Sequence, residues 1–191
     1  MQLHVVIAST RPGRTGLPVA EWFAAQASAH GSFEVRMVDL AEVGLPFLDE
    51  PEHPSTRRYA HQHTREWSRT VDAADAFVFV MPEYNYGFNA PLKNAVDFLY
   101  HEWQYKPVGF VSYGGTSAGT RAVQMIKQVV TTLRMYPLND AVAIPTRERL
   151  SPEGHLLPDS AMTAAATGLL DELERVAPVL GRLRAENAVT V

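Results

Sequence analysis

The feature that most constrains the fold of this sequence is a run of six apolar residues, AFVFVM, at positions 76–81. The run contains no polar residue, so both faces of the strand that it predicts should be buried. A strand buried on both faces belongs to a sheet with helices on either side. Four further segments are typical of strands, at residues 3–8, 33–40, 108–113 and 138–144.

Segments with apolar residues at helical spacing separate these strands. We expect helices at about residues 16–29, 56–74, 89–103, 117–135 and 160–184. Pro178 lies inside the last pattern and predicts a kink or stop just before it. Strands that alternate with helices predict an α/β fold in one domain, residues 1–191. The expected architecture is a doubly wound, five-stranded parallel sheet of order 2-1-3-4-5, with helices on both faces.

Composition excludes several classes of protein. The 191 residues include no cysteine, which rules out disulfides, thiolate metal sites, iron–sulfur clusters and a cysteine nucleophile. Any redox chemistry therefore needs an added cofactor. A net charge of −4 and a pI near 6.0 argue against nucleic-acid binding. The longest apolar run is too short for a membrane helix, and no secretory signal is visible, so we expect a cytoplasmic protein.

The loop after the first strand, STRPGRTG at residues 9–16, is basic and rich in hydroxyls. It leads into a helix, whose N-terminal amides and positive dipole end favour a phosphate. Hydroxyls of Ser9, Thr10 and Thr15 can donate hydrogen bonds. Arg11 and Arg14 can pair with a dianion. The loop matches neither a Walker motif nor GxGxxG, and an ordinary strand–helix turn is the alternative interpretation.

Two more loops should reach the same edge of the sheet. Residues 82–88, PEYNYGF, are aromatic and can cover a planar ligand; packing on the next helix is the alternative. Residues 114–121, GGTSAGTR, contain paired glycines that allow close approach to a ligand, although Ser117 could simply cap a helix. In this fold the ligand crevice lies at the carboxyl ends of the strands. The three loops together predict a mononucleotide, with its phosphate at the first loop and a flat heterocycle between the others.

These motifs, with PLKNAVDFL following PEYN, resemble the NADPH-dependent FMN reductase family of flavodoxin-like proteins. The resemblance covers most of residues 1–145 and implies a flavodoxin-like fold, bound FMN, hydride from NADPH or NADH, and a homodimer or homotetramer. Carried over by motif, the FMN phosphate would be held by Ser9, Arg11, Arg14, Thr15 and Gly16. The isoalloxazine would be lined by Pro82, Glu83, Tyr84 and Asn85, and its pyrimidine edge approached by Gly114, Gly115 and Ser117.

The resemblance also implies the reaction. Family members pass hydride from the nicotinamide to flavin N5 and then to a small acceptor such as a quinone, an azo compound, a metal oxyanion or free flavin. We expect ping-pong kinetics, no catalytic acid or base among the side chains, and backbone amides near Gly114 and Gly115 that stabilise the reduced ring. Many members have Gly-Ser after PEYN, whereas this chain has Tyr86, Gly87 and Phe88, which could alter the acceptor that fits.

Other classes of protein share this sheet order, and the sequence lacks residues that two of them need. A receiver domain needs acidic residues after strand 1, and a low-molecular-weight tyrosine phosphatase needs a cysteine. A flavodoxin-type electron carrier without reductase activity stays the main alternative, although such carriers tend to be more acidic.

Outside the loops, we expect Lys93 and Asp97 to form a helix ion pair. His61 and His63, two apart on a helix, should face different sides and share no metal. Trp103 is a candidate subunit contact.

Overall fold

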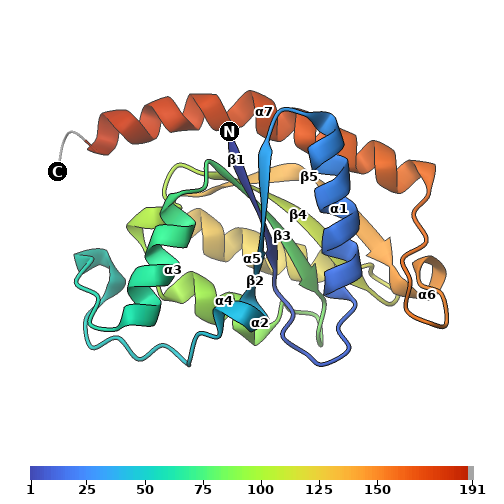
Figure 1. Ribbon diagram of the computed structural model, residues 1–191, viewed down its shortest axis with the longest axis horizontal. Helices are drawn as coiled ribbons and strands as arrows, with labels where there is room; N and C mark the ends of the chain where they lie inside the picture. The colour runs from blue at the N-terminus through green and yellow to red at the C-terminus, as the bar shows by residue number, and fades with distance from the viewer. Residues whose placement is uncertain (189–191) are drawn as a thin grey trace.

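Five parallel strands form one sheet in the order β2-β1-β3-β4-β5, which confirms the predicted flavodoxin-like topology. The computed structural model describes residues 1–188 (Figure 1). The strands span β1 Gln2–Ile7, β2 Glu34–Asp39, β3 Ala76–Pro82, β4 Pro107–Gly114 and β5 Tyr136–Pro145.

Helices cover both faces of the sheet, as expected (Figure 1). One face carries α1 (Gly16–His30) and α7 (Ser160–Ala188). The opposite face carries α3 (Gln62–Asp72), α4 (Ala90–Asp97) and α5 (Thr120–Thr132). Short elements complete the described chain: α2 Leu40–Val43, α6 Thr146–Arg149 and the 3-10 turns η1 Pro54–Thr56 and η2 His101–Trp103.

The central strand β3 explains why the sheet needs two layers of helices. All seven of its residues are buried. Phe77, Phe79 and Met81 belong to the core under α3, α4 and α5, whereas Val78 and Val80 belong to the core under α1 and α7. Alternate side chains of a strand point to opposite faces, so a continuous apolar run serves both cores.

Three helices, α3, α4 and α5, are shorter than the sequence pattern predicts. The helix expected at residues 56–74 begins only at Gln62, because the preceding residues form η1 and a loop, and Glu50 accepts hydrogen bonds from the amides of residues 60 and 61. The helix expected at residues 89–103 ends at Asp97. Indole N–H groups of Trp67 and Trp103 donate to carbonyls of its last turn, at 2.8 and 3.1 Å, so those carbonyls are satisfied without further helix.

Trp103 is therefore a core residue, and the subunit contact proposed for it is wrong. Its side chain is 1% exposed and packs against Trp67 and Phe77.

Proline does not stop the last helix. α7 continues through Pro178 to Ala188, beyond the expected end near residue 184. Pro178 is exposed, so water can bind the carbonyl that loses its helical hydrogen bond. α5 is also shorter than predicted, beginning at Thr120 and ending at Thr132, and the short helices α2 and α6 were not predicted.

His61 and His63 do not face different sides, because His61 is the N-cap and lies outside α3. Their rings stack at 5.2 Å and both approach Asp49. Lys93 and Asp97 form the predicted ion pair, with Nζ 2.5 Å from Oδ2.

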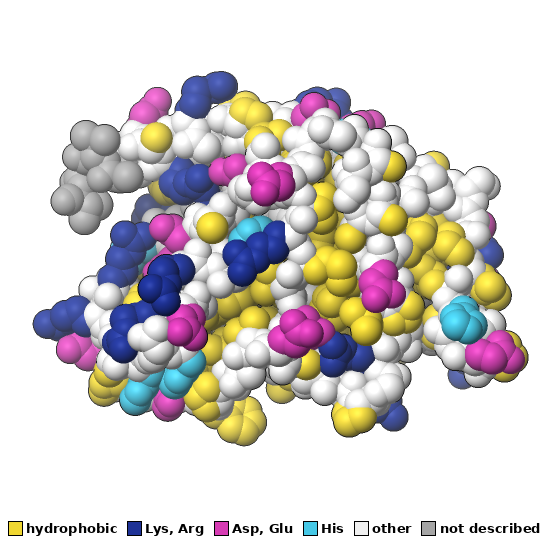
Figure 2. Space-filling model, viewed as in Figure 1, with side chains coloured by type: hydrophobic (Ala, Val, Ile, Leu, Met, Phe, Trp, Pro, Cys, Tyr) yellow, Lys and Arg dark blue, Asp and Glu magenta, His cyan; other side chains and the backbone are white. Residues whose placement is uncertain are grey.

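The surface carries both apolar and charged side chains (Figure 2). In the space-filling view, apolar side chains show in the middle of the face, and Lys and Arg side chains gather at the left, toward the C-terminal end of α7 (Figure 2). Among the described residues, no helix is both long and apolar enough to cross a bilayer.

The side chain of Lys106 lies fully inside the fold. Lys106 is 0% exposed, and its Nζ donates to the carbonyls of Val71 and Asp72 at 2.7 and 3.0 Å. A cation that binds the free carbonyls of a helix C-terminus completes that helix. Burial, reinforced by the nearby Arg184, lowers the pKa of Lys106 to about 7.

Stability should therefore rise with pH between about 7 and 10, because only the unfolded chain then takes up the Lys106 proton. One such group contributes at most about 1.4 kcal/mol per pH unit. We expect Lys106→Met to remove this rise, measured by urea denaturation at several pH values. Lys93→Met, which removes an exposed lysine, should keep it. Parallel profiles for wild type and Lys106→Met would contradict the assignment.

Candidate functional site

Three strand ends meet at one edge of the sheet and define the candidate site. The parallel register pairs Ile7 of β1 with Val80 of β3, and Pro82 of β3 with Tyr113 of β4. The loops at residues 8–15, 83–89 and 115–119 therefore leave the sheet side by side. This placement is the one that the sequence predicts.

The first loop presents hydroxyls and helix amides. Ser9 is 2% exposed, and its Oγ lies 3.5 Å from the hydroxyl oxygen of Tyr84, so the first and second loops touch. Thr15 is the N-cap of α1 but makes no side-chain cap hydrogen bond. Its hydroxyl and the first amides of α1 are thus available to an anion. Arg11 is exposed at the rim of the loop.

Arg14 has a partner within the fold. Its guanidinium forms an ion pair with Asp39, the residue that ends β2 and caps α2. The Nε atom of Arg14 is buried and has no hydrogen-bond partner among the described residues. Arg14 therefore fixes the first loop to β2 and still holds one unused donor.

Gly16 is required where α1 begins. A Cβ at this position would lie 2.7 Å from the hydroxyl oxygen of Tyr113. That hydroxyl is buried, and the side chain of Ser9 is the polar group that interacts with it. Burial raises the pKa of Tyr113, so the phenol keeps its proton and stays a donor.

The second loop is a tight hairpin. The amide of Tyr84 donates to the Gly87 carbonyl at 2.8 Å, and the amide of Gly87 donates to the Tyr84 carbonyl at 2.9 Å. Asn85 and Tyr86 between them have φ values of 49° and 72°, as a type I′ turn requires. The turn holds the rings of Tyr84 and Tyr86 in solvent, 42% and 67% exposed.

Glu83 joins the second loop to the third. Its carboxylate accepts hydrogen bonds from the backbone amide and the Nη1 of Arg121, both at 3.1 Å. The Arg121 guanidinium lies 4.0 Å from the centroid of the Tyr86 ring, a cation–π contact. Glu83, predicted to line a flat ligand, thus has its carboxylate committed to Arg121. Pro82, predicted for the same role, is buried at the end of β3.

The third loop offers backbone and open space. A Cβ at Gly115 would meet nothing within 4 Å, whereas one at Gly119 would lie 2.6 Å from the Ser112 Cβ. Gly119, with φ 87°, is the N-cap of α5, so the capping role considered for Ser117 is wrong. Gly114 is fixed from the start of α6, because Thr146 Oγ1 donates to its carbonyl at 3.0 Å.

Sequence reasoning missed three residues that assemble this edge. Asn89 is 2% exposed and donates from Nδ2 to the Ala8 carbonyl at 2.6 Å, while its Oδ1 has no partner among the described residues. Tyr113 and Arg121 are the other two. The available signal was position: Tyr113 lies next to the end of β4, and Asn89 and Arg121 lie at the starts of the helices α4 and α5 that follow the loops.

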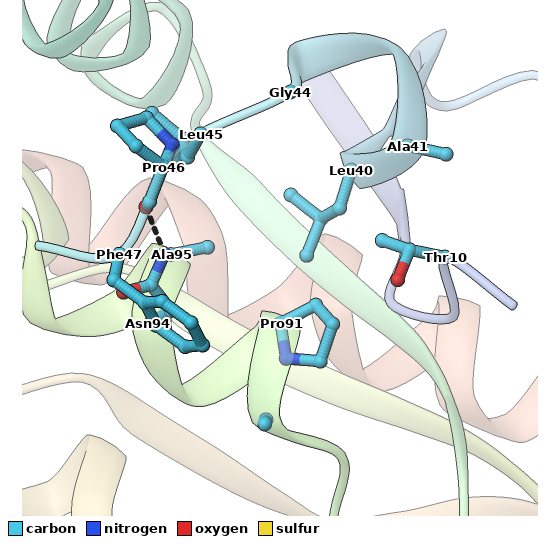
Figure 3. Close-up of a pocket in the computed structure, with 11 residues that line it drawn as sticks. Thr10, Leu40, Ala41, Gly44, Leu45, Pro46, Phe47, Pro91, Asn94 and Ala95 are labelled. Carbon is cyan, nitrogen blue, oxygen red and sulfur yellow. Dashed lines mark hydrogen bonds between the residues drawn. The ribbon is translucent and has the colours of Figure 1, made fainter.

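A cavity of about 540 Å³ lies beside these loops (Figure 3). Thr10 is the residue of the first loop that lines it; the rest of its wall comes from α2, residues 44–47 and the start of α4. Asn94 shapes one side, since its Oδ1 accepts from the Leu48 amide and its Nδ2 donates to the Pro46 carbonyl. The cavity adjoins the loop cluster and is separate from its centre.

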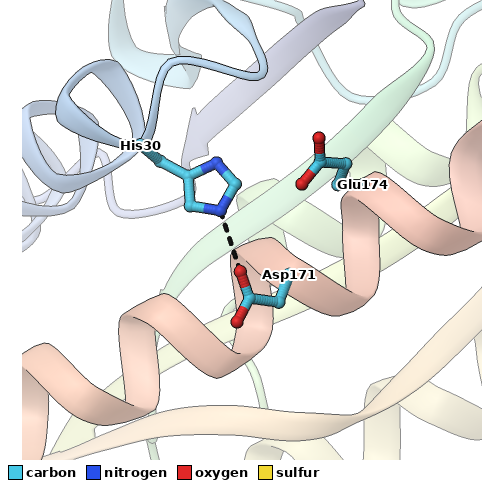
Figure 4. A group of neighbouring side chains, drawn as sticks. All are labelled: His30, Asp171 and Glu174. Carbon is cyan, nitrogen blue, oxygen red and sulfur yellow. Dashed lines mark hydrogen bonds and ion pairs between the residues drawn. The ribbon is translucent and has the colours of Figure 1, made fainter.

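One group of possible metal ligands occurs among the described residues, away from this edge. Ligand atoms of His30, Asp171 and Glu174 lie within 4.8 Å of one another (Figure 4). His30 Nε2 is 3.0 Å from Asp171 Oδ1. This contact joins the end of α1 to α7, and a hydrogen bond between the two side chains accounts for it.

The donors at the loop cluster fit a mononucleotide. Arg14 Nε is a buried donor without an acceptor among the described residues, and the side chain of Thr15 leaves the first amides of α1 uncapped. The buried hydroxyls of Ser9 and Tyr113 lie together beside them. Phosphate oxygens are the acceptors that such a set requires. The exposed aromatic hairpin and the open glycine loop leave the other side for a flat ring.

Comparison with known proteins agrees with this fit. The family model described as NADPH-dependent FMN reductase matches residues 1–149. An NAD(P)H-dependent FMN reductase of Schizosaccharomyces pombe is 39% identical over 148 residues, 75% of this chain and 74% of the relative. A probable NADPH:quinone oxidoreductase of rice is 40% identical over 73 residues, 37% of this chain and 36% of the relative.

A solved structure supports the fold. The flavoenzyme NAD(P)H:acceptor oxidoreductase FerB of Paracoccus denitrificans superimposes with a TM-score of 0.74 at 18% identity, covering 93% of this chain and 97% of FerB.

The chain belongs to the NADPH-dependent FMN reductase family. Membership confirms the predicted enzyme class, a flavin-dependent NAD(P)H oxidoreductase, and its cofactors, FMN and a nicotinamide nucleotide. The family match ends before α7.

Gly16→Ala should lower the free energy of unfolding by about 1–3 kcal/mol, because the methyl group would collide with the Tyr113 hydroxyl. Adding Tyr113→Phe removes that oxygen and should restore most of the loss, as measured by urea denaturation. Gly168→Ala is the control, since a Cβ there meets nothing. Equal stability of Gly16→Ala and wild type would contradict the close contact.

Proposed function

We propose that this protein transfers reducing equivalents from NADPH or NADH to a small acceptor, using FMN held by the three loops at the carboxyl edge of the sheet. The observation that carries the proposal is the convergence of unused donors, helix amides and an aromatic hairpin at that edge. Bound FMN supplies the hydride-accepting and hydride-donating chemistry.

The first loop would bind the FMN phosphate. Ser9, Thr15 and the amides at Gly16 donate hydrogen bonds, and Arg11 adds an exposed positive charge. Arg14 acts partly through Asp39, because their ion pair fixes the loop and leaves Nε to donate. A helix N-terminus with such donors is sufficient to bind a phosphate group.

The other two loops would hold the ring. Tyr84 and Asn85 line one side from the type I′ turn, behind which the Glu83–Arg121 pair fixes the turn to α5. Gly114, Gly115 and Ser117 would approach the pyrimidine edge. Backbone amides there are fixed in place before reaction and can stabilise negative charge, as an oxyanion hole does.

We propose a quinone as the acceptor class, with azo compounds, metal oxyanions and free flavin as further candidates. Flat, uncharged rings suit a rim made by Tyr84 and Tyr86, with the Arg121 charge neutralised by Glu83. Donor and acceptor would use this rim in turn, which gives ping-pong kinetics. The rice relative named for quinone reduction supports the same class.

Purified protein with FMN should oxidise NAD(P)H in the presence of benzoquinone and no other protein. Double-reciprocal plots at several quinone concentrations should be parallel. Binding of FMN without NAD(P)H oxidation would instead favour the alternative, a flavodoxin-type electron carrier. Intersecting lines would exclude ping-pong kinetics.

Arg11→Ala should weaken FMN binding about tenfold, because it removes one charged hydrogen bond to phosphate. Stability of the apoprotein should not change, since Arg11 is exposed. Arg14→Ala should weaken FMN binding and also lower stability, through loss of the Asp39 pair. Fluorescence titration with FMN and urea denaturation measure the two effects. Unchanged FMN affinity with weakened NADPH binding would show that the phosphate assignment is wrong.

The single domain over residues 1–191, the cytoplasmic location and the homodimer or homotetramer stay predictions. Light scattering of the FMN-loaded protein would measure the oligomeric state.

A further inference from the structure

Backbone strain in the described chain is concentrated at two places. Six residues other than glycine have positive φ, a conformation that costs about 1 kcal/mol or more for residues with a Cβ. Three lie in the second and third loops of the flavin site: Asn85, Tyr86 and Ala118. The other three lie elsewhere and are Arg57, Tyr105 and Arg134. Strain at the first place accompanies a functional site, so the second place needs an explanation.

Two members of the second strained group, Arg57 and Tyr105, line one hollow, and the third, Arg134, contacts Tyr105. Tyr105 and Arg134 hold each other, since the Tyr105 amide donates to the Arg134 carbonyl at 2.9 Å and Arg134 Nη1 donates to the Tyr105 hydroxyl at 3.1 Å. The Tyr105 proton therefore remains free for another acceptor. Tyr105 and Arg57 both line a hollow of about 290 Å³.

The lining of this hollow consists of hydrogen-bond donors and contains no carboxylate. Its residues are Ser55, Thr56, Arg57, His101, Gln104, Tyr105, Arg184 and Asn187. They come from four parts of the chain: η1, η2, the segment before β4 and the end of α7. His101 is fixed by a hydrogen bond between its Nε2 and the Ser55 carbonyl, at 2.8 Å.

The lining of the hollow holds two arginines, whereas the carboxylates that act on the neighbouring Lys106, those of Asp72, Asp75 and Glu102, are not part of that lining. Arg57 and Arg184 line the hollow, and the buried Lys106 interacts electrostatically with Arg184. Asp75 opposes them, but its Oδ1 lies 3.5 Å from Arg184 Nη2 and its Oδ2 accepts from the Gln2 amide. Lys and Arg side chains gather on this side of the molecule (Figure 2). A compact anion would complete the arrangement.

This hollow is remote from the flavin site. Gln104 and Tyr105 lie just before β4 begins, whereas the flavin loops follow the ends of the strands. β4 has eight residues and is about 26 Å long. Arg184 also lies beyond residue 149, where the family match ends.

We propose that this hollow is a second ligand site, which binds the phosphate group of inorganic phosphate or of a small phosphomonoester. Two arginines from separate elements can grip a tetrahedral dianion, with the Tyr105 hydroxyl donating a further hydrogen bond. The volume admits a phosphate and a few attached atoms. Arg57 also ends η1, where its amide donates to the Pro54 carbonyl, so its left-handed backbone is that of a helix cap. The left-handed backbone at Tyr105 is held by its two hydrogen bonds with Arg134.

Isothermal titration of the gel-filtered, FMN-loaded protein tests the proposal, with inorganic phosphate and glycerol 3-phosphate as probes at constant ionic strength. Loading with FMN keeps the first-loop phosphate site filled. We expect saturable binding of at least one probe, and the tighter probe identifies free phosphate or a phosphomonoester as the source. Arg57→Gln/Arg184→Gln should weaken binding about tenfold or more without changing FMN retention.

Arg58→Gln/Arg175→Gln is the matched control. It removes the same charge from the same two regions, at exposed arginines paired with Glu52 and Glu172. We expect binding within about twofold of wild type. Absence of saturable binding, an equal loss in both double variants, or unchanged binding in Arg57→Gln/Arg184→Gln would overturn the proposal. None of these results depends on reductase activity, so the proposed function is tested separately.

Discussion

The alignment of β1, β3 and β4 is the constraint on which the rest of the structure depends. Their parallel register places three loops at one edge, and the continuous burial of β3 fixes that register between two cores. A shift by one residue would exchange Phe77 and Phe79 with Val78 and Val80 between the two faces, and neither core could pack. The site is therefore held by the same packing that stabilises the sheet.

The loops are joined to one another before any ligand binds. Arg14 ties the first loop to β2, Glu83 ties the second to α5, and Asn89 ties the end of β1 to the start of α4. What remains unused after these contacts is a set of donors and a strained, exposed aromatic turn. A flavin site needs this combination, because the cofactor carries the chemistry and the protein supplies position and electrostatics.

The sequence predicted the sheet order and the three loops, because both follow from local patterns and from general rules of topology. Tertiary contacts could not be predicted from these local patterns. Two indole hydrogen bonds end α4 at Asp97, and these made Trp103 a core residue. The partners of Arg14 and Glu83 lie 25 and 38 positions away, so their ion pairs were invisible from motif spacing. Exposure of Pro178, which lets α7 continue, likewise depends on packing.

FMN should bind at these three loops and at no other hollow of the described chain. Chemical-shift mapping of the apoprotein on addition of FMN tests it most directly, with riboflavin, which lacks the phosphate, as the comparison. We expect shifts at amides in residues 9–16, 83–88 and 114–119, with those in residues 9–16 reduced or lost when riboflavin replaces FMN. Shifts centred instead on the cavity between α2 and α4, or on the hollow at Arg57 and Arg184, would contradict it.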